Sequence, residues 1–205
     1  MDIIEEELKI FHKIGVKEVA ILDPIFFRDK ERAKLILDKI KRICPEIRFE
    51  IQTKFEHLND ELIGMISELN IYLGCGVQTS DPFVQKEIKR LNNNEKMIKN
   101  MKLLEEKGIN FEVHLIYGLP YQDIQSLQAD FKLLNKYTSE IKLFPLSRLR
   151  GTGLDVILGA DNSEMVFSPI FPREVISTKW INTEDILEIK INGLNSTIFL
   201  SSISN

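Results

Sequence analysis

Hydrophobic residues recur along this chain with two alternating spacings. Helical spacing, with apolar positions three and four residues apart, predicts helices over 2–14, 29–43, 60–69, 81–90, 94–107 and 124–135. Between them, short apolar runs predict strands over 18–22, 48–52, 71–73, 111–116 and 140–144. Strands that alternate with helices in this way predict βαβ units and a parallel sheet of the α/β class.

Two architectures satisfy this pattern, a doubly wound sheet and a (β/α) barrel. A complete eight-unit barrel takes roughly 250 residues, so a chain of 205 would form at most a partial one. In both architectures ligands bind just past the C-terminal ends of the strands. The strand ends are therefore where a site is expected.

The chain changes character after Gly151-Thr152-Gly153. Residues 154–171 have no clean hydrophobic period, 175–180 are expected to be extended, and 183–191 are expected to form a helix. We expect residues 1–150 to form the sheet domain and 151–205 to form a C-terminal extension that packs on it without chemistry of its own.

Composition narrows the function classes. Lys and Arg number 27 against 31 Asp and Glu, and the tail from Gly151 carries the whole net charge of −4, so no nucleic-acid surface is indicated. No apolar run approaches the ~20 residues of a membrane span. The charged, helix-like N-terminus is unlike a secretory leader, and a cytoplasmic location is expected.

The chain has two cysteines, Cys44 and Cys75. Two thiolates can form neither a four-thiolate zinc site nor the usual ligand set of an iron–sulfur cluster. We therefore expect both to be small buried hydrophobic residues in a reducing compartment, and no metal site in this chain.

Most residues at the predicted strand ends are small or uncharged hydrogen-bonding residues, with little that could act as a general acid or base. There is no Ser-His-Asp order, HExxH motif or Gly-Lys-Ser phosphate loop, and His114 lies within a predicted strand, where a structural role is expected. A small-molecule rim is indicated, and no reaction. The strand-end residues are Asp23, Pro24, Thr53, Gly74, Gly76, Gln78, Thr79, Ser80, Gly118, Pro120, Pro145 and Ser147.

Two of these strand ends are suited to a ligand. Gly74-Cys75-Gly76 would let a ligand approach the backbone, and Gln78, Thr79 and Ser80 offer amide and hydroxyl groups before a helix N-terminus. Ordinary helix capping by Ser80 or Asp81 accounts for the second group equally well. Gly118-Leu119-Pro120 can likewise be only a strand-to-helix turn.

Taken in order, three segments resemble radical S-adenosylmethionine (radical SAM) enzymes: LGCGVQTSDPFVQKEIKR (73–90), HLIYGLP (114–120) and KLFPLSRLRGTGLD (142–155). Two more, VKEVAILDPIFF (16–27) and FSPIFPREVISTKWINTEDI (167–186), resemble the members that carry an N-terminal cobalamin-binding domain. The resemblance implies a partial TIM-type (β/α)6 barrel whose first strand is missing.

The resemblance also implies cofactors. Such enzymes hold a 4Fe-4S cluster on a CxxxCxxC loop, and the cluster reduces S-adenosylmethionine to release a 5′-deoxyadenosyl radical. This sequence has no CxxxCxxC. We therefore expect a truncated, cluster-lacking fragment, inactive alone, of a parent enzyme. By the resemblance, that parent uses S-adenosylmethionine and a 4Fe-4S cluster, and it can carry cobalamin in a further domain.

By similarity, residues at three strand ends would bind S-adenosylmethionine. The methionine amino group is expected near Asp23 and Pro24, and its carboxylate or the ribose near Gln78 and Ser80, with Thr79 standing where the family often has serine. The remaining expected contacts are the backbone at Gly76 and, for adenine, Ile116, Tyr117 and Gly118.

Two other readings stay open. The chain could be a non-catalytic binding module that completes a barrel with a partner polypeptide, because an unpaired edge strand promotes association. It could also be an unrelated α/β hydrolase or transferase that uses Asp23 or His114, although neither has an identifiable nucleophile beside it.

Overall fold

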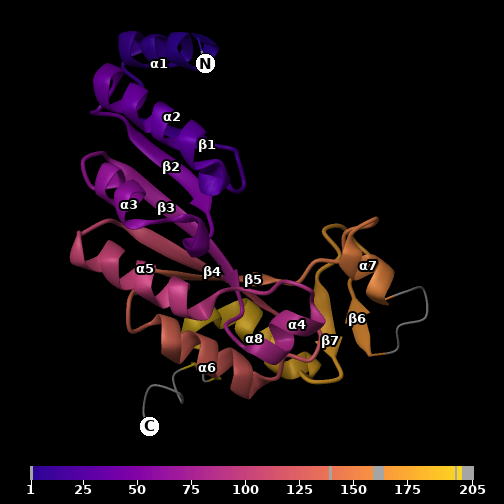
Figure 1. The fold of residues 1–205 in the computed structure, drawn as a ribbon. Coiled ribbons are helices and arrows are strands. Elements are labelled where there is room, and N and C mark those ends of the chain that lie inside the picture. The colour runs from indigo at the N-terminus through magenta and orange to yellow at the C-terminus, as the bar shows by residue number, and fades with distance from the viewer. Residues whose placement is uncertain (1, 139, 159–163, 197, 200–205) are drawn as a thin grey trace. The chain divides into compact units, whose positions relative to one another are not determined.

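The computed structural model describes residues 2–138, 140–158, 164–196 and 198–199 (Figure 1). Its main sheet has five strands in the spatial order β1-β2-β3-β4-β5, and the pairs β1-β2 and β2-β3 are parallel. The strands are β1 (Glu18–Ile21), β2 (Arg48–Thr53), β3 (Ile71–Gln78), β4 (Phe111–Tyr117) and β5 (Ile141–Pro145). The predicted α/β class and parallel sheet are confirmed.

The strand order decides between the two architectures. A doubly wound sheet reverses its strand order at a switch point, whereas consecutive strands of a (β/α) barrel lie next to one another. Here the spatial order equals the chain order, as in a barrel. The connecting helices are α2 (Lys30–Ile43), α3 (Asp60–Ile66), α4 (Pro82–Glu87), α5 (Asn94–Glu106) and α6 (Ile124–Leu134), preceded by α1 (Asp2–Ile14).

The chain divides into two compact units, which are described separately. The first comprises Met1–Gly76, Asn93–Val113 and Tyr137–Glu140, and the second comprises Val77–Asn92, His114–Lys136 and Ile141–Asn205. In the first unit, helices α1, α2, α3 and α5 lie side by side in chain order, each in contact with the next (Figure 1). The alternating sequence of β2 buries every second residue, which is the pattern of a strand with one face in a core.

Burial of one face of each helix stabilises the first unit. Helix α2 turns Ala33, Ile36, Leu37 and Ile40 inward, at the spacing that its sequence predicts. Each large apolar side chain of this kind stabilises the fold by roughly 1.5–3 kcal/mol relative to an exposed position. Glu31 and its neighbours on the opposite face stay in solvent.

Strand β3 is longer than its sequence predicts, and the prediction that it ends at Leu73 is wrong. It continues through Gly74, Cys75 and Gly76 to Gln78. Gly74 lies opposite Gln52 of β2, and a Cβ atom at Gly74 would come within 2.3 Å of the Gln52 amide nitrogen. A side chain at Gly74 would therefore have to displace the Gln52 amide group, and the polar strand end begins at Gln78.

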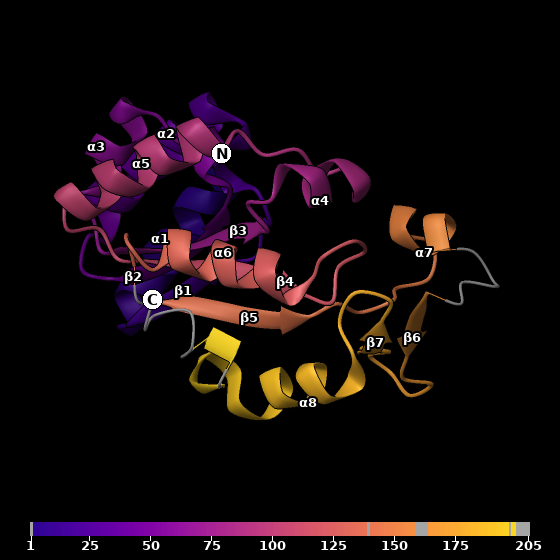
Figure 2. The ribbon, with the colours of Figure 1, turned by 90° about the horizontal axis from the view of Figure 1, so that it is seen from below.

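The second unit contains β5, α6 and the C-terminal segment. Figure 2 shows α8 (Thr183–Asn192) running along β5, which confirms the predicted C-terminal helix. Within the region predicted to lack periodicity, the structure has α7 (Gly153–Leu158) and β6 (Met165–Phe167), and β6 pairs antiparallel with β7 (Val175–Thr178). Elements of six and three residues are too short to show a hydrophobic period.

Within the described ranges, no helix is both long and apolar enough to cross a bilayer. The expected division at residue 150 into a sheet domain and an extension stays a prediction.

Candidate cofactor site at the strand ends

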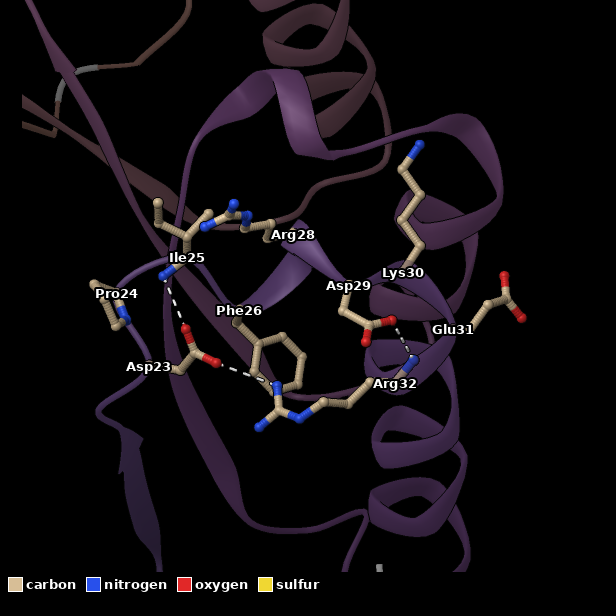
Figure 3. Close-up of a pocket in the computed structure, with 9 residues that line it drawn as sticks. All are labelled: Asp23, Pro24, Ile25, Phe26, Arg28, Asp29, Lys30, Glu31 and Arg32. Carbon is tan, nitrogen blue, oxygen red and sulfur yellow. Dashed lines mark hydrogen bonds and ion pairs between the residues drawn. The ribbon is translucent and has the colours of Figure 1, made fainter. Parts of the chain in front are cut away.

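The C-terminal end of β1 opens on a pocket of about 840 Å³ in the first unit (Figure 3). All of its lining comes from the segment between β1 and the first turn of α2. Asp23 and Pro24, both predicted site residues, lie at its rim, beside the buried Phe26. The structure thus brings these two residues to a cavity at a strand end.

The carboxylate of Asp23 is already fixed within this pocket. It accepts hydrogen bonds from the main-chain N–H of Ile25 at 3.0 Å and from Nη1 of Arg32 at 3.2 Å, and Figure 3 shows the Arg32 group meeting it beside the Phe26 ring. The Arg32 guanidinium carbon lies 5.6 Å from the centroid of that ring. The Asp23 side chain is one third exposed, so part of its carboxylate faces solvent and can meet an amino group.

In the second unit, the end of β3 places Gln78 in a costly conformation. Its backbone φ is 64°, a left-handed value that residues other than glycine and asparagine rarely adopt. Its Oε1 is buried and has no hydrogen-bond partner among the residues that the structure describes. Each feature destabilises the folded chain by roughly 1–3 kcal/mol. A contribution to folding stability therefore does not explain why glutamine occupies this position.

Ser80 is held two residues further on by a buried carboxylate. Oδ1 of Asp130 on α6 accepts hydrogen bonds from the main-chain N–H of Ser80 at 2.7 Å and from its hydroxyl at 2.5 Å. Burial raises the pKa of Asp130 to about 6, although the bonds from Ser80 oppose that shift. The other oxygen of Asp130, Oδ2, has no partner within the described part of the chain.

Thr79 is fully buried, and its carbonyl and hydroxyl oxygens accept hydrogen bonds from residues that follow it in the chain. Its carbonyl accepts bonds from Nε2 of Gln85 at 2.9 Å and from Nδ2 of Asn92 at 3.2 Å, and its hydroxyl accepts from the Asp81 N–H at 3.1 Å. Ser80 is partly exposed and therefore the more accessible of the two neighbouring hydroxyls. Asp81 also caps α4, as predicted.

The end of β4 is organised by a buried glutamine. Nε2 of Gln122 donates to the carbonyl of Ile116 at 3.0 Å, and its Oε1 accepts from the N–H of Leu119 at 3.2 Å. The Tyr117 carbonyl accepts from the N–H of Leu146 at 3.0 Å. The carbonyls of Ile116 and Tyr117 are thus already hydrogen-bonded. The partly exposed Ile116 side chain is the apolar surface that a ligand could contact at this strand end.

Gly118 and Tyr117 complete this strand end. Gly118 has a φ of 79°, and a Cβ atom on it would lie 2.6 Å from Cγ1 of Val175, so only glycine fits. Burial, and to a lesser degree the Glu174 charge, raises the pKa of the Tyr117 phenol to about 12. The phenol is neutral at physiological pH and supplies no anion.

The predicted site residues thus fall into two groups. Asp23, Pro24 and Gly76 belong to the first unit, with Gly76 inside β3 rather than beyond it. The second unit holds the others: Gln78, Thr79, Ser80, Ile116, Tyr117 and Gly118.

The sequence missed the two buried groups that organise the second unit's strand ends, Asp130 and Gln122. Asp130 occupies an inward position on α6, between Leu127 and Leu134. A carboxylate on an otherwise apolar helix face is a signal that the sequence did contain. His114 lies within β4, as expected, with its ring centroid 5.2 Å from that of Phe144.

The residues present do not fit an iron–sulfur cluster. Cys44 and Cys75 are both buried free thiols. Burial raises the pKa of Cys44 to about 11 and that of Cys75 well above its usual range, which disfavours the thiolate that iron binds. Within the described ranges, no three His, Cys, Asp or Glu side chains gather into a metal site.

A sheet whose spatial strand order equals its chain order places the chain in the (β/α)-barrel class, whose ligands bind at the C-terminal ends of the strands. The family model of the Radical SAM superfamily matches residues 1–134. The chain therefore belongs to the radical SAM superfamily, and the predicted family is confirmed.

Similar proteins agree with this assignment. An uncharacterized methyltransferase of Pyrococcus horikoshii is 23% identical over 144 residues, which are 69% of this chain and 31% of that protein. The radical SAM methyltransferase TsrM of Kitasatospora setae, with cobalamin and a [4Fe-4S] cluster bound, matches with a TM-score of 0.69 and 13% identity over 86% of this chain and 37% of its own.

Coproporphyrinogen III oxidase HemN of Escherichia coli, also a radical SAM enzyme, matches with a TM-score of 0.66 and 16% identity over 94% of this chain and 44% of its own. This chain thus spans less than half the length of these relatives. The structural likenesses show the shared barrel-type fold, and S-adenosylmethionine and a 4Fe-4S cluster are cofactors of the family.

Proposed function

We propose that this chain is the part of a radical SAM enzyme that binds S-adenosylmethionine, and that it is inactive without a cluster loop from another segment or chain. The observation that carries the proposal is Gln78, whose left-handed backbone and buried, unpartnered Oε1 lie at the end of β3. Such costs are typical of a residue kept for a ligand. The bound cofactor would supply the adenosyl group on which the family's chemistry depends.

The proposed contacts follow the strand ends. Asp23 and Pro24 would receive the amino group of methionine, and Gln78 with Ser80 its carboxylate or the ribose, with Thr79 buried behind them. The other proposed contacts are Gly76 along β3 and, for adenine, Ile116, Tyr117 and Gly118. This chain's residues would bind and orient the cofactor, and no residue of the chain is assigned a proton transfer.

The parent's reaction class is also a proposal. Two of the similar proteins are named as methyltransferases, and one was solved with cobalamin, which supports methyl transfer with cobalamin in the parent enzyme. A cytoplasmic location remains part of the proposal, since both cysteines are free thiols.

The test compares the chain alone with the chain joined to a segment that carries a CxxxCxxC loop. After anaerobic iron–sulfur loading and reduction, chromatography measures 5′-deoxyadenosine released from S-adenosylmethionine. The joined protein should release it, whereas the chain alone should bind no cluster, release none and show weak or undetectable binding of S-adenosylmethionine in calorimetry. Cleavage by the chain alone would refute the proposed inactivity, and tight binding by the chain alone would refute the expected dependence of binding on the cluster. No release by the joined protein would refute the proposed role in binding S-adenosylmethionine.

A second candidate is a non-catalytic module that pairs with a partner polypeptide. Strand β1 is the terminal strand of the sheet, and Leu22 just beyond it is 91% exposed. An open strand edge of this kind favours pairing with another chain. Size-exclusion chromatography distinguishes the candidates, because a stable monomer argues against an obligate partner.

A further inference from the structure

Three arginines line a cavity of about 420 Å³ in the second unit. Arg148 and Arg150 follow the C-terminal end of β5, and Arg173 lies on the loop between β6 and β7. The main chain joins the two segments, because the N–H of Arg148 donates to the carbonyl of Arg173 at 3.1 Å. Residues 25 positions apart in the sequence are thereby brought to one cavity.

The charge of this cavity is only partly compensated. Nε of Arg148 pairs with Oδ1 of Asp155 at 2.7 Å, and that pairing holds the pKa of Asp155 below its usual range. Glu174, next to Arg173, is bound to Lys190. Arg150 and Arg173 have no side-chain ion pair within the described part of the chain. The cavity thus holds two guanidinium groups, those of Arg150 and Arg173, that no carboxylate of the described residues pairs with.

Arg173 has a strained backbone conformation. Its φ is 58°, in the left-handed region, and its N–H donates to the carbonyl of Ile170 at 2.8 Å. A residue with a side chain in this region is strained, and such strain is common where a side chain is aimed at a ligand. The aromatic ring of Phe171, 81% exposed, lies at the same cavity and offers an apolar surface beside the charges.

We propose that Arg148, Arg150 and Arg173 form a binding site for the phosphate group of a phosphate monoester. A phosphate dianion matches the two guanidinium groups of Arg150 and Arg173, and guanidinium groups suit its oxygens. The cavity lies past the end of β5, where a barrel of this class places its ligands. That the phosphate belongs to the parent's substrate rests on the proposed function, whereas phosphate binding itself does not.

The test titrates the full 205-residue chain with inorganic phosphate, and separately with acetate, at constant ionic strength and follows binding by calorimetry. Phosphate should bind saturably, and acetate at least about tenfold more weakly. Arg150→Gln and Arg173→Gln should each weaken phosphate binding about tenfold, since one charge-assisted contact is lost in each. Arg42→Gln, which removes an exposed charge on α2, should leave binding unchanged.

Three results would overturn the proposal: no saturable phosphate binding, an affinity for acetate equal to that for phosphate, or an affinity for phosphate that neither cavity variant lowers relative to the parent chain. Arg150 is exposed, so its variant stays informative even if Arg173→Gln fails to fold. The titration uses neither S-adenosylmethionine nor a cluster. Its failure would therefore leave the proposed function standing, and failure of the cofactor test would leave the phosphate site standing.

Discussion

Ser80 and Asp130 are bound to each other twice across 50 positions of sequence, through the main-chain N–H and the hydroxyl of Ser80, both donating to Oδ1 of Asp130. Helix α6 thereby fixes the strand end that carries the proposed ligand-binding hydroxyl. A buried carboxylate with two donors is costly to disrupt, because its removal leaves both donors without an acceptor.

Substitution of Asp130 should separate the acceptor from the charge. Asp130→Ala removes the acceptor and is expected to lower the free energy of unfolding by about 2–3 kcal/mol. Asp130→Asn keeps an oxygen at the same place and should cost less. Urea unfolding measures both, and Asp38→Asn on the exposed face of α2 should change nothing. An alanine variant as stable as the parent chain would show that the pairing contributes little.

The same residue should make stability depend on pH. Because burial raises the pKa of Asp130 from 3.8 to about 6, the folded state holds this proton more tightly than the unfolded state does. The contribution of Asp130 to stability should therefore increase as the pH falls from about 6 to about 4. Relative to Asp130→Asn, the parent chain should gain up to about 3 kcal/mol over that range.

Comparison with the variant removes other acid effects. The bonds from Lys39 and Lys9 hold the pKa of Glu5 at about 2, so acidification weakens that site equally in both proteins. Urea unfolding at several pH values gives the difference directly. A constant difference between pH 7 and pH 4 would mean that Asp130 titrates normally in the folded chain.

The sequence predicted the sheet well because its signals are local. Alternation in β2 and the cap at Asp81 depend on neighbouring residues, and the structure has both. The end of β3 was missed because glycine usually interrupts a strand pattern, whereas Gly74 here continues β3 in register with Gln52 of β2. Asp130 was missed because its partner, Ser80, is distant in the chain, and no local rule predicts such pairs.

Gly118 should tolerate no side chain. Gly118→Ala would combine a left-handed backbone with a Cβ atom 2.6 Å from Val175, so we expect a loss of about 2–4 kcal/mol in unfolding free energy. Gly151 is the matched control, since its φ is also left-handed at 78° but nothing lies within 4 Å of its Cβ position. Gly151→Ala should lose only about 1 kcal/mol in the same unfolding measurement. Equal losses would mean that Val175 moves aside without cost.

Both cysteines should be inert in the folded chain. Burial raises the pKa of the Cys44 thiol to about 11, so at pH 8 its thiolate fraction is roughly a hundredfold below that of an ordinary thiol. Cys75 is buried as well, and its pKa is also raised. A colorimetric disulfide reagent should label both quickly in urea and neither without it. Rapid labelling of the folded chain would show that at least one thiol is accessible, and would reopen the question of metal binding.

Gln78 should lower the free energy of unfolding of the chain. Gln78→Ala removes the buried, unpartnered Oε1 but keeps the left-handed backbone, so the free energy of unfolding should rise rather than fall. Gln78→Gly also relieves the backbone and should exceed the alanine variant by about 1 kcal/mol. Urea unfolding of the three proteins gives both differences. Two destabilised variants would mean that Gln78 holds the strand end together, and the argument that it is kept for a ligand would fail.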